Sequence, residues 1–382
     1  MASAQPAASA NARPIAIRLD QVTKHFPGTA NAAVASLSLE LREGEITVLV
    51  GPSGCGKTTT LKMINRLIEP TSGRIEVFGD DQSALPAHEL RRRIGYVIQE
   101  TGLFPHRTIA QNIGTVPRLL GWDARRIRAR VEELAALVGL EAEQLERYPA
   151  ALSGGQRQRA GVARALAADP PILLMDEPFG AVDPVVRARL QDELLALQQS
   201  LHKTIVFVTH DIEEAMRLGD RVAILDVGGV LAQYAPPAEM LRHPANAFVE
   251  EFLGRERGLR ELSLVRVAEV NLDRCCELPP STSASDARAA IARAGTDFAL
   301  VVEDDCCVGW LDRGQLATVG DDAVVGDLAE PLARWTEPQQ TLREALEVAL
   351  TSGTRVAIVQ DEGRYLGILP IERIGERLRG AS

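Results

Sequence analysis

Residues 51–58, GPSGCGKT, decide the fold of this chain because they form a complete G-x-x-x-x-G-K-[ST] phosphate loop. The loop follows the apolar run 45–50 (EITVLV) and precedes apolar residues at helical spacing, namely Leu61, Ile64 and Ile68. Glycines in such a loop let backbone N–H groups close on a β-phosphate without side-chain clash. A strand, a phosphate loop and a helix in this order predict an α/β domain that binds a nucleoside triphosphate.

Side chains of the loop complete the predicted nucleotide site. We expect Lys57 to neutralise β- and γ-phosphate oxygens and the hydroxyl of Thr58 to reach Mg²⁺. A nucleoside triphosphate and Mg²⁺ are therefore the ligands that this loop predicts. The residues of this segment expected to contact the nucleotide are Gly51, Pro52, Ser53, Gly54, Cys55, Gly56, Lys57, Thr58 and Thr59.

A second glycine-rich stretch, residues 152–156 (LSGGQ), stands just ahead of the helical segment 157–167. Its backbone N–H groups and the start of that helix offer another surface for anions. One chain cannot easily bring both surfaces to the same nucleotide, whereas two chains arranged head to tail can. We therefore expect a homodimer with ATP between the phosphate loop of one chain and four residues of the other, namely Ser153, Gly154, Gly155 and Gln156.

Two carboxylates, Asp176 and Glu177, end the apolar run 172–175. Ligands of open α/β sheets bind at the carboxyl ends of strands, so Asp176 is placed to hold the Mg²⁺ shell. Glu177 can accept a proton from the attacking water, a general-base role worth on the order of 10²–10⁴ in rate. His210 follows the next apolar run, 205–208, and we expect it to contact the γ-phosphate and position the water. The alternative is that these are plain solvated residues at strand ends.

These motifs occur once each and in an order that resembles the ATP-binding-cassette (ABC) family over about the first 250 residues. The resemblance implies that Gln99, at a strand end, touches Mg²⁺ and the water. It also implies that Asp183 crosses the dimer interface. It further implies that Phe26 stacks on adenine, worth about 1–3 kcal/mol by analogy with base–aromatic contacts. The alternatives are an acidic turn before Pro184 and a Phe packed in the interior or in a turn.

The expected fold class is an α/β P-loop ABC ATPase domain with a mainly parallel sheet core and a helical subdomain. The continuous apolar runs are typical of strands covered on both faces. Between residues 99 and 149 the pattern becomes helical, and Gly139 suits a helix stop. The apolar stripe of this region consists of Ile127, Val131, Leu134 and Val138. The implied catalytic residues are Lys57, Gln99, Glu177 and His210, and the implied metal ligands are Thr58, Gln99 and Asp176.

Bulk composition narrows the class of protein. A chain of 382 residues is long enough for two or three domains. The net charge of −10 disfavours nucleic acid as the main partner. No apolar run approaches the ~20 residues needed to cross a bilayer. The Ala/Ser-rich start is expected to be a disordered tail, not a signal peptide, and the five cysteines do not look like a disulfide framework. We therefore expect a cytosolic protein.

An internal repeat occupies the C-terminal part. Residues 299–305 and 308–311 parallel residues 356–362 and 366–369, with an offset of 57 before the turn and 58 after it, because Gly363 is extra. A helical segment precedes each copy, and the pattern resembles a tandem pair of cystathionine-β-synthase (CBS) modules of α+β class. The predicted domain order is a disordered tail at 1–13, an ABC ATPase domain at 14–255, CBS module 1 at 256–319 and CBS module 2 at 320–382.

The resemblance leaves the role of the CBS pair open. Nucleotide-binding copies usually follow the glycine with Thr or Ser and then a ribose-binding Asp. Here the first copy has Asp312 and Gln315, and the second has Pro370 and Arg373. We therefore favour dimerisation or a response to ionic strength over binding of an adenosine-type ligand. Two adjacent cysteine pairs, 275–276 and 306–307, lack the usual zinc spacing, and their role stays open.

Finer patterns indicate a branch of the ABC family. The chain has a single cassette and no fused membrane helices, as in the ATPase subunits of bacterial importers. Residues 61–73, 95–106 and 244–254 look like the quaternary-amine importers, which take up osmoprotectants such as glycine betaine, choline and carnitine. The resemblance implies ATP hydrolysis coupled to import at the cytoplasmic face of the inner or plasma membrane. The alternatives are import of another solute, such as amino acids, and a regulatory ATPase without transport.

The same resemblance implies the partners of the chain. They are integral-membrane permease subunits and, indirectly, an extracytoplasmic solute-binding subunit. Residues 102–106 (GLFPH) combine apolar and turn residues in an expected surface loop, and exposed apolar groups mark contact sites. In this family the corresponding groove receives a short helix of the permease. The alternative is that Phe104 packs inside the helical subdomain.

Overall fold

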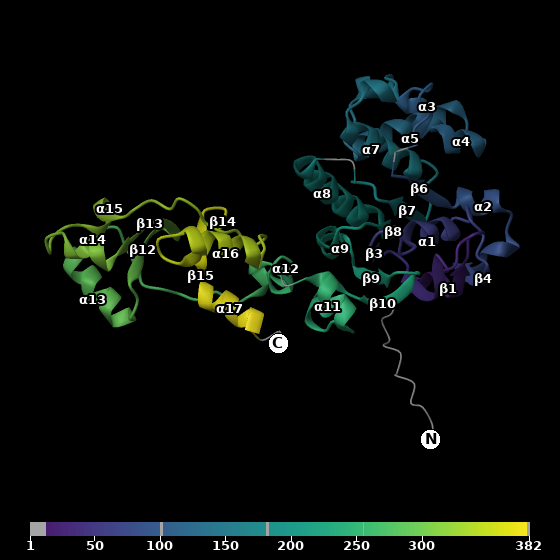
Figure 1. The fold of residues 1–382 in the computed structure, drawn as a ribbon. Coiled ribbons are helices and arrows are strands. Elements are labelled where there is room, and N and C mark those ends of the chain that lie inside the picture. The colour runs from purple at the N-terminus through teal and green to yellow at the C-terminus, as the bar shows by residue number, and fades with distance from the viewer. Residues whose placement is uncertain (1–12, 100–101, 181–182, 255, 380–382) are drawn as a thin grey trace. The chain divides into compact units, whose positions relative to one another are not determined.

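The computed structural model describes residues 13–99, 102–180, 183–254 and 256–379. The chain forms two compact units divided between Leu253 and Gly254 (Figure 1). Residues 1–12 of the predicted tail lie outside the described residues, as do residues 100–101 and 181–182 within two of the predicted motifs.

A six-stranded sheet forms the core of the first unit, in the order β10-β9-β3-β8-β7-β6. All neighbouring pairs are parallel except β9 with β10. Every residue of β3, β7 and β8 is buried, as in sheets covered on both faces. The predicted mainly parallel sheet is thus confirmed. The strands are β3 (Ile46–Val50), β6 (Ile94–Val97), β7 (Ile172–Asp176), β8 (Thr204–Val208), β9 (Arg221–Asp226) and β10 (Val230–Ala235).

A second, antiparallel sheet was not predicted. Its order is β2-β1-β4-β5. Its inward residues, such as Leu19, Leu39 and Ile75, share one hydrophobic core with the main sheet and with Leu61 and Ile64 of the helix after the phosphate loop. The phosphate loop is therefore anchored in a well-packed part of the unit. The elements are β1 (Ile15–Lys24), β2 (Val34–Arg42), β4 (Ser72–Val77), β5 (Asp80–Asp81) and α1 (Lys57–Ile64).

The interval between β6 and β7 is helical, as predicted. Val131, Leu134 and Val138 of the predicted stripe are buried, and Gly139 has a φ of +66°, which suits a helix end. The helices of this subdomain gather above the strands in Figure 1. They are α3 (Ile109–Ile113), α4 (Thr115–Leu119), α5 (Ala124–Leu137), α6 (Ala142–Leu145), the 3-10 helix η2 (Pro149–Ala151) and α7 (Gly154–Leu166).

The remaining helices of the first unit cover the sheet or follow it. Glu214 of α9 and Gln191 of α8 are joined by a buried hydrogen bond, so these two helices are linked to each other. The elements are η1 (Gln82–Ala84), α2 (Ala87–Arg92), α8 (Pro184–Leu201), α9 (Ile212–Leu218), α10 (Pro237–Arg242) and α11 (Ala247–Leu253).

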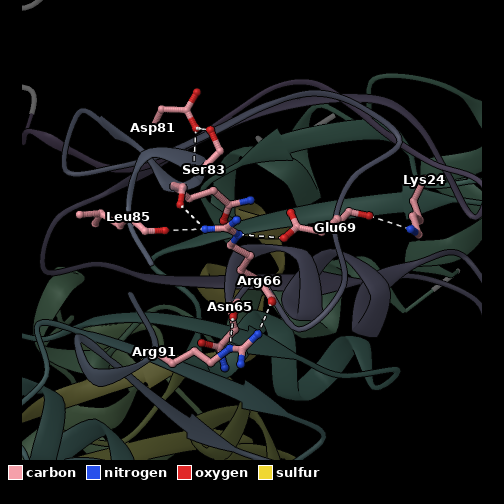
Figure 2. A network of polar contacts seen from close by, with 9 residues as sticks. Lys24, Asn65, Arg66, Glu69, Asp81, Ser83, Leu85 and Arg91 are labelled. Atoms are coloured by element: carbon pink, nitrogen blue, oxygen red, sulfur yellow. Dashed lines mark hydrogen bonds and ion pairs between the residues drawn. The ribbon is translucent and has the colours of Figure 1, made fainter. Parts of the chain in front are cut away.

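A polar network fastens the end of α1 (Figure 2). Arg66 has a φ of +50°. Its guanidinium pairs with Glu69 at 2.8 Å and donates to the carbonyls of Gln82 and Leu85 at 3.1 and 2.6 Å. Lys24, at the end of β1, donates to the Glu69 carbonyl at 2.6 Å. The network holds the end of α1 against the end of β1, so the segment that carries Phe26 is fixed relative to the phosphate-loop helix.

The second unit contains a three-stranded sheet, β11-β12-β13, and a two-stranded sheet, β14-β15. A helix precedes each hairpin, and Ser283 and Thr341 each accept from the backbone N–H three residues ahead, with a capping box in addition at Thr341. The elements are α12 (Arg257–Leu262), η3 (Val267–Glu269), β11 (Glu277–Leu278), α13 (Ala284–Ala294), β12 (Phe298–Glu303), β13 (Cys306–Asp312), α14 (Arg313–Ala317), α15 (Val325–Leu328), α16 (Leu342–Thr351), β14 (Val356–Asp361), β15 (Arg364–Pro370) and α17 (Ile371–Arg379).

The offset between the two copies differs from the prediction. Glu303 pairs with Cys306, and Asp361 pairs with Arg364, so both hairpin loops contain two residues and the copies are related by 58 positions on both sides of the turn. Gly363 is therefore not extra. Positive φ at both loop positions is the mark of a type I′ turn, which suits two-residue hairpins. The angles are Asp304 +49°, Asp305 +63°, Glu362 +49° and Gly363 +86°.

The two copies exchange their leading segments. Val265 and Val267 pack with α16 of the second copy, and the Val265 carbonyl accepts from the backbone N–H of Leu342 at 2.9 Å. In the reciprocal position, Val325 packs with α13 of the first copy and donates to the Thr282 carbonyl at 2.9 Å. Each core therefore contains residues from both halves of the repeat.

Candidate nucleotide-hydrolysis site

The phosphate loop joins β3 to α1, as the sequence predicts. Gly56 has a φ of +94°, and a Cβ there would lie 2.4 Å from the carbonyl oxygen of Ala33, so only glycine fits. The Lys57 ammonium is buried and donates to the carbonyls of Gly51 and Pro52 at 2.7 and 3.0 Å. Phosphate oxygens would give this ammonium stronger, charge-assisted hydrogen bonds.

A hydroxyl and a carboxylate meet beside the loop. Thr58 Oγ1 of α1 donates to Asp176 Oδ1, at the end of β7, at 2.8 Å. Burial raises the pKa of the Asp176 carboxyl, and the hydrogen bond from Thr58 opposes this shift. Oxygen ligands of this kind suit Mg²⁺, which is usually held by one or two carboxylates together with substrate phosphates. The pair therefore fits the predicted metal.

Glu177 stands at the centre of a cluster drawn from three strand ends. Its Oε1 lies 3.2 Å from His210 Nδ1, and its Oε2 accepts from Gln99 Nε2 at 3.4 Å. The backbone N–H of Glu177 donates to the Val208 carbonyl at 2.9 Å, which ties the end of β7 to β8. Glu177 also has a φ of +45°, a conformation that costs free energy outside glycine. The structure thus brings together three of the predicted catalytic residues.

The second glycine-rich stretch caps α7. Ser153 Oγ accepts from the Gln156 backbone N–H at 3.3 Å, and Gln156 Oε1 accepts from the Ser153 backbone N–H at 2.9 Å. Ser153 and Gly154 are exposed, and an added Cβ at Gly154 would meet no atom within 4 Å. In the part of the chain that the structure describes, no hydrogen bond joins this stretch to the phosphate loop. The helix start is therefore open to another molecule.

Two further predicted residues lie at the surface. Asp183 caps α8 and accepts from the Val186 backbone N–H at 3.1 Å, which is the turn role named as its alternative. Its neighbours Ala181 and Val182 lie outside the described residues. Phe26 is 36% exposed, so the interior alternative does not apply, and the Lys24 ammonium lies 5.3 Å from its ring centroid. The ring is accessible to a stacking partner.

The structure adds one residue that the sequence analysis missed. Burial, and after it the charge of Asp176, raises the pKa of the Tyr96 hydroxyl. The Tyr96 hydroxyl is thus buried near the Asp176 carboxylate, without a hydrogen-bond partner among the described residues. The sequence places Tyr96 near the end of β6. Its proximity to Asp176 follows only from the pairing of β6 with β7 in the sheet.

The described residues contain neither a cluster of His, Cys, Asp or Glu side chains for a metal ion nor a helix that could span a membrane. Among the described residues, no group of three or more His, Cys, Asp or Glu side chains is arranged to hold a metal ion. No helix within those same ranges is long and apolar enough to cross a membrane.

Comparisons with known proteins place the chain in a family. Residues 34–180 match the model of the ABC transporter family. The chain is similar to the osmoprotectant import ATP-binding protein OsmV of Salmonella typhimurium, with 44% identity over 95% of this chain and 96% of the relative. It is also similar to the glycine betaine/carnitine/choline transport ATP-binding protein OpuCA of Bacillus subtilis, with 45% identity over 92% of each chain.

Solved structures match the first unit. The dimeric structure of MJ0796, a bacterial ABC transporter cassette, has a TM-score of 0.53 and 35% identity, and the match covers 58% of this chain and 98% of that one. A post-hydrolysis dimer of the same cassette bound to ADP and Pi gives a TM-score of 0.53 and 33% identity, with the same coverage.

The fold, the strand-end cluster and these matches define an ATP-hydrolysing cassette, and the chain belongs to the ABC transporter family. Because the similarity to the osmoprotectant group extends over both units, the chain belongs with the ATP-binding subunits of that group.

Proposed function

We propose that the chain energises import of a quaternary-amine osmoprotectant, such as glycine betaine, choline or carnitine, through a membrane permease. One observation carries this proposal: relatives similar over at least 92% of the chain, including the second unit, are named for transport of these solutes. Import of another solute and a regulatory ATPase without transport remain outcomes of the test. The chain would lie at the cytoplasmic face of the membrane, bound to the permease subunits, with an extracytoplasmic solute-binding subunit as an indirect partner.

The proposed chemistry is hydrolysis of ATP at the cluster around Glu177. Thr58 and Asp176, with Gln99, would hold Mg²⁺, which when bound neutralises charge on the β- and γ-phosphates. Lys57 would bind β- and γ-phosphate oxygens. Glu177 would take the proton of the attacking water, and its 3.2 Å contact with His210 supports a shared water and γ-phosphate site.

The proposed active form is a homodimer. The exposed start of α7, with Ser153 and Gly154, would face the γ-phosphate bound by the second chain, and helix N-termini favour such anions. Asp183, exposed at the start of α8, would lie at the interface between the chains. The exposed ring of Phe26 would stack on adenine. Support comes from the dimeric form of the similar cassette.

The second unit is proposed to be a CBS pair with a role in dimerisation or regulation. The repeat at a constant offset of 58 positions and the exchange of leading segments support a paired module. The proposed boundaries stay at 256–319 and 320–382. Asp312 caps α14 and accepts from the Gln315 backbone N–H at 2.8 Å, so its carboxylate already has a structural use.

An uptake assay tests the proposed function. The chain, its permease and its solute-binding subunit would be reconstituted in vesicles with ATP inside and labelled glycine betaine, choline, carnitine or an amino acid outside. We expect ATP-dependent uptake of at least one quaternary amine and none by the Glu177→Gln variant. Uptake of amino acids alone would show that the chain serves an amino-acid importer. Failure to co-purify with any permease would favour a regulatory ATPase without transport.

The loop 102–106 provides a separate prediction on coupling. Phe104 is 40% exposed and its ring stacks with Arg107 at 4.8 Å, while its backbone N–H donates to Asn112 Oδ1 at 2.7 Å. The loop is thus held by its backbone, and the ring is available for a partner. We expect Phe104→Asp, and likewise Leu103→Asp, to weaken permease association and uncouple transport while the isolated subunit keeps most of its ATPase activity.

A thermal melt decides between this interpretation and the core alternative. Loss of a core Phe costs about 3–5 kcal/mol, which would lower the melting temperature strongly. A near-normal melt with reduced permease pull-down supports the contact role. Phe78→Asp is the matched control, because Phe78 has the same 40% exposure and lies between β4 and β5, outside the helical subdomain. Equal loss of permease binding by the control would contradict the assignment.

A further inference from the structure

A buried carboxyl group lies close to the predicted catalytic histidine and has no use in the chemistry above. Glu214 of α9 is only 7% exposed. Burial raises the pKa of its carboxyl, and hydrogen bonds from Thr209 and Gln191 oppose the shift. A buried polar group of this kind costs free energy unless its partners compensate. An apolar side chain would fill the space at lower cost. The partners of Glu214 therefore indicate what the group does.

The first partner connects Glu214 to α8. Gln191 Nε2 donates to Glu214 Oε1 at 3.0 Å, and both side chains are buried. Gln191 Oε1 in turn accepts from Arg217 at 3.0 Å, and Arg217 also pairs with Asp192 at 2.7 Å. The Gln191 amide is thus fixed in orientation, because its oxygen and its nitrogen both have partners. Glu214 and Arg217 therefore both join α9 to α8, and Glu214 is the buried one of the two.

The second partner connects Glu214 to the turn that carries His210. The buried Thr209 hydroxyl lies near the Glu214 carboxylate and lowers its pKa. The same Thr209 oxygen accepts from the Asp211 backbone N–H at 3.0 Å. Asp211 caps α9 and accepts from the backbone N–H groups of Glu213 and Glu214 at 2.8 and 3.4 Å. The residues on both sides of His210 are therefore held by one connected set of hydrogen bonds.

The charges around this carboxyl are mixed. Arg187 of α8 lies 3.8 Å from Asp211, and its charge lowers the pKa of Glu214, whereas Asp211 raises it. The His210 side chain is 61% exposed, and its Nδ1 lies 3.2 Å from Glu177. The backbone of this turn therefore sets where the side chain starts. The position of the imidazole thus depends on the geometry of the turn.

We propose that Glu214 is a positioning residue: its carboxylate accepts from Gln191 of α8 and lies beside the Thr209 hydroxyl, and so fixes the His210 turn against α8. The His210 imidazole then stays within contact of Glu177. Because Asp183 caps the start of α8, the same contact links the exposed start of α8 to the hydrolysis site. The inference rests on the roles of His210 and Glu177 in the proposed function.

Steady-state hydrolysis by the full-length chain tests the proposal. We expect Glu214→Ala to lower kcat for ATP by about 10- to 100-fold, since a displacement near 1 Å can cost on the order of 10². KM should change by less than about twofold, because Lys57 and Phe26 bind the nucleotide elsewhere. Glu214→Gln keeps an acceptor oxygen and should restore kcat to within about threefold of the wild type. A merely structural role would not separate kcat from KM in this way.

Three further variants sharpen the test. Gln191→Leu and Thr209→Val each remove a polar group beside the Glu214 carboxylate, and each should lower kcat. The double variant Gln191→Leu/Glu214→Ala should be no slower than Glu214→Ala alone, because contacting residues are not additive. Glu213→Ala is the matched control on the exposed side of the same turn and should keep kcat. If Glu214→Ala does not fold, normal kcat in folded Thr209→Val would overturn the proposal.

The outcomes separate this inference from the proposed function. Normal hydrolysis by His210→Ala would remove the proposed role of the histidine, and the inference with it. An inactive His210→Ala together with a fully active Glu214→Ala would overturn the inference alone. Equal losses of kcat in Glu214→Ala and Glu214→Gln would also overturn it, because the amide oxygen should replace the carboxylate as acceptor.

Discussion

Replacing Glu177 with Gln is expected to slow ATP hydrolysis by about 10²-fold or more while leaving ATP binding intact. The amide cannot take the proton of the attacking water. The Thr58–Asp176 pair, at 2.8 Å, and the Lys57 ammonium remain in place, so nucleotide contacts are kept. The introduced amide can still contact the side chains of His210 and Gln99, so the cluster should keep its geometry. The variant should accumulate as an ATP-bound dimer.

Phosphate release and size-exclusion chromatography with ATP measure these two effects. Glu40→Gln, an exposed change on β2, is the control and should leave both unchanged. Near-normal turnover by the purified Glu177→Gln variant would remove Glu177 from the role of general base. Slow turnover without a stable dimer would support Glu177 as the general base but contradict the predicted accumulation of an ATP-bound dimer.

Replacing Ser153 with Arg is expected to abolish ATP-driven dimerisation and turnover while a single chain still binds nucleotide. The exposed Ser153 side chain caps α7, and the proposed dimer places it against the γ-phosphate of the partner. A bulky cation would fill that space and would also remove the cap, at about 1 kcal/mol. The phosphate loop belongs to a different segment, so nucleotide binding by one chain should survive.

Size-exclusion with ATP, nucleotide titration and a thermal melt together test this expectation. Ser153→Thr keeps a small capping hydroxyl and should dimerise normally. Glu143→Arg, an exposed change on α6 of the same subdomain, introduces the same side chain and should also dimerise. Unchanged dimerisation of Ser153→Arg with a normal melt would refute the head-to-tail arrangement.

Part of the fold could be predicted from the sequence because its signals are local. The phosphate loop, the buried runs around residues 172–175 and 205–208, and the helical stripe of α5 each indicate their own element. The antiparallel sheet β2-β1-β4-β5 was not predicted, because its central pairing, β1 with β4, joins segments separated by the phosphate loop and α1. The hydrophobic pattern predicts the repeat. It does not predict the correct offset before the turn, because the two hairpin loops have equal length but different residues, Asp304-Asp305 and Glu362-Gly363.

By itself, the sequence determined which chemistry the chain carries: phosphate-loop glycines, Lys57, and carboxylates that directly follow apolar strands. These follow from residue type and spacing along a few consecutive positions. Only the tertiary structure decided that Gln99, Glu177 and His210 meet, with contacts of 3.4 and 3.2 Å from Glu177. It also decided that Glu214 is buried between α8 and the His210 turn. The reason is that neighbours in a parallel sheet come from distant segments, so the order of strands, which no local pattern encodes, sets which side chains share an edge.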